Sequence, residues 1–159
     1  MRAWRITKEK HRKTAFDGEG AKLSPGRWNH RGLPAVYVAA TISLAALEYL
    51  VNTETDTAPE SLLVIPVDLH TELSLQVLET TQLPHDWRHY PHPESTRDLG
   101  SNWLRALTTV ALSVPSAVVP QERILVLNPR HAQFSELEIG AAEPFSFDPR
   151  LWRRSPLQR

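Results

Sequence analysis

Residues 35–50 read AVYVAATISLAALEYL, and this stretch decides the fold class. Its first part, residues 35–39, has the pattern of a buried strand because its apolar side chains follow one another without a charge. A helix then begins with Thr41 or Ser43 as its N-cap, since either hydroxyl can accept a backbone N–H bond of the first turn. We expect this helix to continue to about Asn52.

Shorter elements are predicted on both sides of this stretch, because 13 prolines divide the chain. Residues 15–34 hold four of the six glycines and are expected to form a long loop, and residues 84–94 an irregular connection. A second helix is expected over residues 99–112 from the spacing of its apolar side chains. Strands are expected over residues 3–7, 62–69, 116–119 and 123–127, with one or two more after residue 132. Two helices among short strands, without regular alternation, indicate an α+β fold.

The composition bounds the class of protein. With 159 residues and 41% hydrophobic content, the chain can form one core, so we expect a single domain over residues 1–159. The absence of cysteine excludes a disulfide scaffold, a thiolate metal site and a cysteine nucleophile. The longest apolar run, residues 62–67, is too short to cross a bilayer, and the first ten residues have no signal-peptide pattern. We therefore expect a cytoplasmic protein that does not enter a membrane.

The formal net charge is zero, but the charges are unevenly distributed. Residues 1–31 carry nine Lys and Arg against three acids, whereas residues 32–122 carry three against eleven. This asymmetry predicts a face that binds an anion. Nucleic acid is a weak candidate because the basic residues form neither a helix face nor an aromatic strand platform. A small phosphorylated ligand fits as well.

Glu48 is the most informative single residue. Leu44, Leu47 and Val51 form an apolar stripe on the predicted helix, and Glu48 falls on that same stripe. A carboxylate on a buried face costs several kcal/mol unless it has partners. Either Glu48 has such a partner, or it lies at a helix edge where its side chain reaches solvent.

Arg27 lies in a turn-forming segment, residues 24–29, which reads SPGRWN. Gly26 allows the backbone to approach a ligand closely, and an arginine can bind a diphosphate with two hydrogen bonds or neutralise a buried carboxylate. The alternative is a surface Arg27 stacked on Trp28. Tyr37 is either a core aromatic or a ligand contact.

Three histidines, His85, His89 and His92, have a spacing that could place zinc ligands on one face of a helix. Pro91 and Pro93 interrupt such a helix, so surface histidines are favoured, no metal is assigned, and a zinc site is the minority alternative.

Seven short segments and the C-terminal part occur in an order that identifies a family. The segments are WRI at 4–6, AFDGEGA at 15–21, GRWN at 26–29, VYVA at 36–39, LAALE at 44–48, VPSAV at 114–118 and LNPRH at 127–131, followed by PFSFDPRL at 144–151. This order resembles the RES-domain family, the toxins of Res–Xre toxin–antitoxin systems in bacteria. The arginine, glutamate and serine that give the family its name correspond here to Arg27, with Arg5 as a second candidate, Glu48 and Ser116.

The resemblance implies an ADP-ribosyltransferase-like fold and an enzyme that consumes NAD as a substrate, with no separate cofactor. Such a toxin releases nicotinamide from NAD, with water or phosphate as acceptor, and is neutralised by an Xre-type helix-turn-helix antitoxin. DNA contact then occurs only through the antitoxin. Two alternatives stay open: ADP-ribosylation of a target protein, and a non-catalytic partner module of a DNA-binding regulator.

The resemblance also implies roles for individual residues. Glu48 would stabilise the positive charge that develops on the ribose, and Arg27 would hold the diphosphate or the ribose. Tyr37 would pack against nicotinamide, and Ser116 would adjust the arginine or the glutamate by hydrogen bonding. By itself, Ser116 reads as an ordinary strand serine, because no nucleophile-elbow motif surrounds it. The implied NAD-binding residues are Arg5, Gly20, Arg27, Trp28 and Tyr37.

Overall fold

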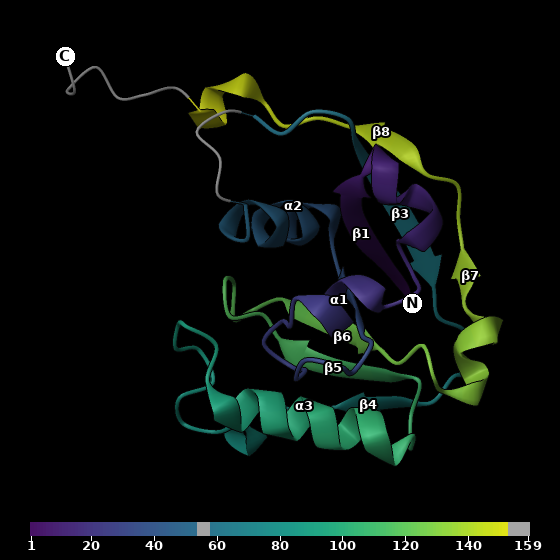
Figure 1. Ribbon diagram of the computed structural model, residues 1–159, viewed down its shortest axis with the longest axis vertical. Helices are drawn as coiled ribbons and strands as arrows, with labels where there is room; N and C mark the ends of the chain where they lie inside the picture. Colours follow the sequence, from purple (N-terminus) through teal and green to yellow (C-terminus); the bar gives the residue numbers. More distant parts are fainter. Residues whose placement is uncertain (54–57, 153–159) are drawn as a thin grey trace.

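The computed structural model describes residues 1–53 and 58–152, and eight strands of these residues form one curled, mixed sheet (Figure 1). The strand order is β4-β5-β6-β2-β1-β3-β7, with β8 also paired to β3. Only β4 and β5 run parallel among these pairs. The strands are β1 Arg2–Lys8, β2 Val36–Ala39, β3 Leu62–Asp68, β4 Leu75–Val77, β5 Ala111–Pro115, β6 Arg123–Leu127, β7 Glu138–Ile139 and β8 Glu143–Phe145. The α+β class predicted from the sequence is confirmed.

Both faces of this sheet are covered. Along β6, Ile124 and Val126 belong to one core cluster, which also contains residues of the helices. Leu125 and Leu127 belong to a second cluster on the other face. Successive residues of a strand point to opposite faces, so this alternation explains why β6 is apolar at every position after its first.

The helix α2, Ile42–Val51, starts where the sequence predicts. Thr41 is its N-cap, and its side-chain oxygen accepts the N–H of Leu44 at 3.1 Å. The predicted apolar stripe is wrong, however, because Leu47 and Val51 are 39% and 59% exposed. Leu44 and Ala45 are the buried positions, and the helix packs them against β1 and β2.

The helix α3, Glu94–Ala106, begins and ends earlier than the predicted range of 99–112. Leu107 has a φ of 52°, in the left-handed region, and this conformation ends the helix. The sequence does not predict this helix end, because glycine, and rarely leucine, occupies the left-handed position that ends a helix. The residues from Ala111 onward form β5 instead.

Two other segments differ from expectation. Residues 116–119, predicted as a strand, form a bend after β5, because Ser116 Oγ accepts the N–H groups of both Val118 and Val119. Within the expected loop, Glu19–Leu23 form the short helix α1 after Gly18 in a left-handed conformation. The short 3-10 helices are η1 Glu9–Thr14, η2 Thr80–Gln82, η3 Ala132–Glu136 and η4 Pro149–Trp152. Residues 84–93 are irregular, as predicted.

The helix α3 fixes the loop that carries Arg27. Gly100 lies directly against the carbonyl of Trp28, where any side chain would overlap it. Ser101 Oγ accepts the N–H of His30 at 2.8 Å, and the His30 ring lies 2.7 Å from Asp98 Oδ1. These contacts attach the residues that follow Arg27 in the loop to α3. No helix within residues 1–53 and 58–152 is long and apolar enough to cross a membrane.

Candidate active site

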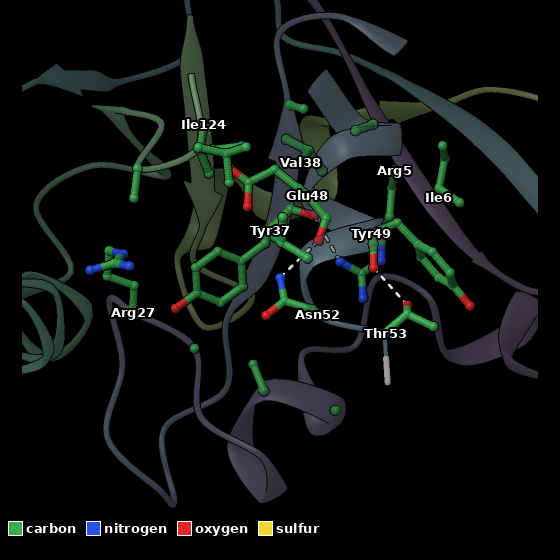
Figure 2. Close-up of a pocket in the computed structure, with 18 of the residues that line it drawn as sticks. Arg5, Ile6, Arg27, Tyr37, Val38, Glu48, Tyr49, Asn52, Thr53 and Ile124 are labelled. Atoms are coloured by element: carbon green, nitrogen blue, oxygen red, sulfur yellow. Dashed lines mark hydrogen bonds between the residues drawn. The ribbon is translucent and has the colours of Figure 1, made fainter. Parts of the chain in front are cut away.

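A pocket of about 1570 Å³ lies at the junction of β1, β2 and α2 with the loops around residues 24–28 and 88–92. Its wall carries most of the residues that the sequence singled out, together with Arg88, which it did not, and His92, which it considered only as a possible zinc ligand. These residues are Arg5, Gly20, Arg27, Trp28, Tyr37, Glu48, Arg88 and His92. In Figure 2, Tyr37 and Glu48 lie between Arg27 on one side and Arg5 on the other.

Glu48 projects from α2 into this pocket and has a partner behind the wall. Ser116 Oγ donates a hydrogen bond of 2.7 Å to Glu48 Oε1. Because the same oxygen accepts two backbone N–H bonds of 3.0 Å, its single proton is directed at the carboxylate. Burial raises the pKa of the Glu48 carboxyl above its ordinary value, while the Ser116 bond and the charge of Arg27 oppose that rise.

Arg27 is held by backbone rather than by side chains. Its Nη1 donates to the carbonyl of Trp87 at 2.5 Å and to that of His89 at 2.9 Å. The other guanidinium nitrogens have no acceptor among the residues that the structure describes, which leaves them for a ligand in the pocket. Burial lowers the pKa of Arg27, and the charge of Glu48 partly offsets this effect. The alternative of a surface Arg27 stacked on Trp28 is wrong, because Trp28 is 3% exposed and packs in the core.

The hydroxyl of Tyr37 is used within the protein. It donates to Asn29 Oδ1 at 2.7 Å and accepts the N–H of Trp28 at 3.1 Å. Burial raises the pKa of this phenol above its ordinary value. A Cβ at Gly26 would lie 2.8 Å from the Tyr37 ring, so only glycine fits beside it. Tyr37 therefore fixes the loop around Arg27 and offers a ligand its ring rather than its hydroxyl.

Asn29 joins the loop segments of the site by hydrogen bonds, and the sequence pattern assigned this residue no role. It is fully buried, and its Nδ2 donates to the carbonyls of Ala21, His30 and Leu33. Its Oδ1 accepts from Gly26 N–H at 2.9 Å as well as from Tyr37. The sequence feature that could have predicted this role is the position of Asn29 at the end of the turn-forming segment, because asparagine side chains in turns hydrogen-bond nearby backbone groups.

Arg5 and Gly20 differ in how they meet the pocket. Arg5 is partly buried, and its Nη1 donates to the Tyr37 carbonyl at 2.8 Å, while burial lowers its pKa. Its Nε has no partner within the described part of the chain. A Cβ at Gly20 would meet no atom within 4 Å, so no protein contact requires glycine there.

The segment 84–93 contributes more than the sequence suggested. Arg88 donates from Nε to the carbonyl of Ala117 at 3.2 Å and so joins this segment to the bend that carries Ser116. His92 lines the pocket, whereas His85 and His89 are exposed. Within the described residues these three rings do not gather around a shared metal position. A proline-rich segment without periodicity gave no signal for these contacts.

Comparisons with known proteins identify the family of this chain. The RES domain family matches residues 2–148. The chain is 35% identical to "Toxin Res" of Yersinia enterocolitica, over 95% of this chain and 99% of that protein. It is 31% identical to the "Prs ADP-ribosylating toxin" of Sphingobium sp., over 96% and 97%.

Among solved structures, the crystal structure of the M. tuberculosis MbcT–MbcA toxin–antitoxin complex contains a chain of the same fold. The TM-score is 0.70 at 23% identity, with 95% of this chain and 86% of that chain covered. This match supports the fold that the resemblance implied. By sequence and by fold, the chain belongs to the RES domain family and is homologous to Res toxins over nearly its whole length.

Proposed function

We propose that this protein is the toxin of a toxin–antitoxin system and that it consumes NAD by cleaving the bond between nicotinamide and ribose. The observation that carries the proposal is that Glu48 and Arg27 line one pocket. The pocket of about 1570 Å³ is large enough for more than a small ligand, and within it the charge of Arg27 opposes the rise that burial causes in the pKa of Glu48. NAD is the substrate in this proposal, and no further cofactor is required.

Glu48 supplies the chemistry. When the nicotinamide–ribose bond breaks, its electron pair leaves with nicotinamide as a neutral molecule, and positive charge develops on the ribose ring. An ionised carboxylate held beside that carbon lowers the energy of this state. The acceptor's lone pair then forms the new bond to the ribose, and Glu48 is placed to take the proton that the acceptor loses. The Ser116 hydrogen bond fixes the carboxylate and favours its ionised form.

Arg27 supplies the binding. Its planar guanidinium is already fixed through Nη1 by two carbonyls, so little conformational freedom is lost when a ligand arrives. The remaining N–H groups match the geometry of a diphosphate. Arg5 adds a second guanidinium on the other side of Tyr37 (Figure 2). Tyr37 offers its ring to the nicotinamide, and Gly20 and Trp28 complete the wall.

A toxin that consumes NAD requires an inhibitor in the cell that makes it. The solved relative was crystallised as a toxin–antitoxin complex, which supports an antitoxin partner for this chain too. We infer that this partner is an Xre-type helix-turn-helix protein and that this chain meets DNA only through it.

Transfer of ADP-ribose to a protein is the second candidate, and the name of the Sphingobium relative favours it. Both reactions break the same bond and differ in the acceptor. Purified chain, freed of any partner, is incubated with NAD that is labelled in the adenylate, with and without cell lysate. Nicotinamide release with free ADP-ribose supports hydrolysis, ADP-ribose phosphate supports phosphorolysis, and a labelled protein supports transfer. Intact NAD in every arm contradicts the proposal and favours a non-catalytic partner module.

A further inference from the structure

The pocket wall holds a titratable side chain that the mechanism above does not use. His92 follows directly on the segment whose carbonyls hold Arg27, and its ring lines the pocket. Its Nδ1 is buried, with no hydrogen-bond partner in the described part of the chain. A buried polar atom without a partner costs free energy, so packing within the described residues does not explain a histidine here. Because Nδ1 is closed to solvent, a ligand in the pocket would meet the ring through its other atoms.

The surroundings of His92 define what that ligand is. The charged groups that act on its ring are Arg27, from the loop after α1, and Arg97, from α3. Arg97 Nε is likewise buried without a partner among the described residues, and Arg97 does not line the pocket. On its own segment, the His92 ring meets the edge of the exposed Tyr90 ring, with centroids 5.6 Å apart. A neutral ring that lines the pocket and is acted on by two guanidinium charges indicates a place for an anion.

We propose that His92 is a further ligand-binding residue of this pocket, which hydrogen-bonds a phosphoryl oxygen and takes up a proton when that anion binds. The proposal rests on the proposed function, because the anion that NAD brings is its diphosphate. Inorganic phosphate offers the same oxygens and is the second possible source. Arg27 binds the anion in either case, and His92 adds a contact whose strength depends on pH.

The proton uptake follows from electrostatics. Burial and the charges of Arg27 and Arg97 lower the pKa of His92 to about 4, so the ring is neutral near pH 7 without a ligand. A bound anion offsets both guanidinium charges and accepts a hydrogen bond from the protonated ring, so it raises this pKa. Between the two pKa values, binding takes up a proton, and affinity increases as the pH falls.

Calorimetry measures this uptake directly. Binding of ADP-ribose, which has no nicotinamide bond to break, is measured at pH 6 in two buffers of different ionisation enthalpy, and inorganic phosphate is measured in parallel. The wild-type chain should take up a fraction of a proton in at least one arm, and the arm that shows it identifies the anion. His92→Asn should abolish the uptake and weaken binding at pH 6 about tenfold, the effect of one hydrogen bond to a charged group. The control is His85→Asn, an exposed histidine of the same segment, which should behave as wild type.

The outcomes separate the two proposals. If the wild-type chain cleaves NAD but binds both ligands without proton uptake, His92 has no such role and the proposed function stands. If His92→Asn keeps the wild-type uptake, another group takes the proton and the inference is overturned. If the chain neither binds ADP-ribose nor consumes NAD, the proposed function fails and this inference fails with it. Equal thermal unfolding of the two variants shows that a difference in binding does not come from the fold.

Discussion

Ser116 Oγ donates a hydrogen bond of 2.7 Å to Glu48 Oε1 from behind the pocket wall, where Ser116 is only 1% exposed. The two residues are 68 positions apart and come from the bend after β5 and from α2. Because two backbone N–H groups occupy the lone pairs of the serine, its proton has one direction open to it. This bond defines Ser116 as a positioning residue for the carboxylate.

Ser116→Ala tests this role through pH. The serine bond lowers the pKa of Glu48, so removing it raises that pKa, and the ionised form disappears at a higher pH. The acidic limb of the nicotinamide-release profile should therefore move to higher pH. The loss of an acceptor for the N–H groups of Val118 and Val119 should also cost about 1–3 kcal/mol of unfolding free energy. Ser116→Thr retains a hydroxyl, so its acidic limb should lie at the wild-type pH. If Ser116→Ala also leaves the acidic limb at the wild-type pH, Ser116 does not position Glu48.

Arg27→Lys tests the guanidinium. Lysine keeps the charge but loses the planar fork, so KM for NAD should rise at least tenfold with a smaller change in kcat, if the residue holds the diphosphate. Arg31→Lys is the matched control, because Arg31 is exposed and is not part of the pocket wall. Steady-state kinetics of both variants decide the matter. An unchanged KM in Arg27→Lys means that another residue, with Arg5 as the first candidate, holds the diphosphate.

Two glycine substitutions separate a packing role from a ligand role. Gly26→Ala places a methyl group 2.8 Å from the Tyr37 ring, so it should lower the unfolding free energy by about 1–3 kcal/mol. Gly20→Ala meets open space and lies in α1, so the fold should be as stable as wild type or slightly more stable. If NAD approaches the backbone at Gly20, that methyl group raises KM. Thermal unfolding of both variants reports on packing, and KM for NAD reports on ligand binding. If Gly26→Ala is as stable as wild type, the packing argument is wrong.

Gly100→Ala tests how α3 supports the site. Its methyl group would overlap the Trp28 carbonyl, so the helix and the loop after Arg27 must separate. We expect a loss of about 2 kcal/mol or more in unfolding free energy, together with weaker NAD binding. Asn102→Ala, at an exposed position of the same helix, should leave NAD binding unchanged and the fold as stable as wild type or slightly more stable. Chemical denaturation of the two variants measures the difference, and equal midpoints count against the packing of α3 on this loop.

The parts that the sequence predicted are those with a local cause. Thr41 caps α2 because a hydroxyl there meets the N–H of Leu44, three residues further on. The inward position of Glu48 follows from helical spacing, although the stripe used to infer it is partly exposed.

The rest depends on causes that a sequence pattern does not contain. Leu107 ends α3 in a conformation that leucine seldom adopts, so the end of the helix was predicted too late in the sequence. Arg27 binds the backbone carbonyls of Trp87 and His89, and any residue type supplies a carbonyl. The neighbours of His92 come from separate segments, and only the folded chain brings them together.

The central claim is that the negative charge of Glu48 drives cleavage, and Glu48→Gln tests it most directly. The variant keeps the shape and hydrogen-bonding capacity of the side chain and removes only the charge. Burial raises the pKa of Glu48 and so disfavours its ionised form in the fold, which predicts that the variant unfolds at the same or a higher temperature than wild type. Glu143→Gln, at an exposed position, is the control and should retain full activity. The measurement is nicotinamide release at saturating NAD: we predict a fall of about 10²–10³-fold in kcat for Glu48→Gln, and a wild-type rate in that variant would contradict the account.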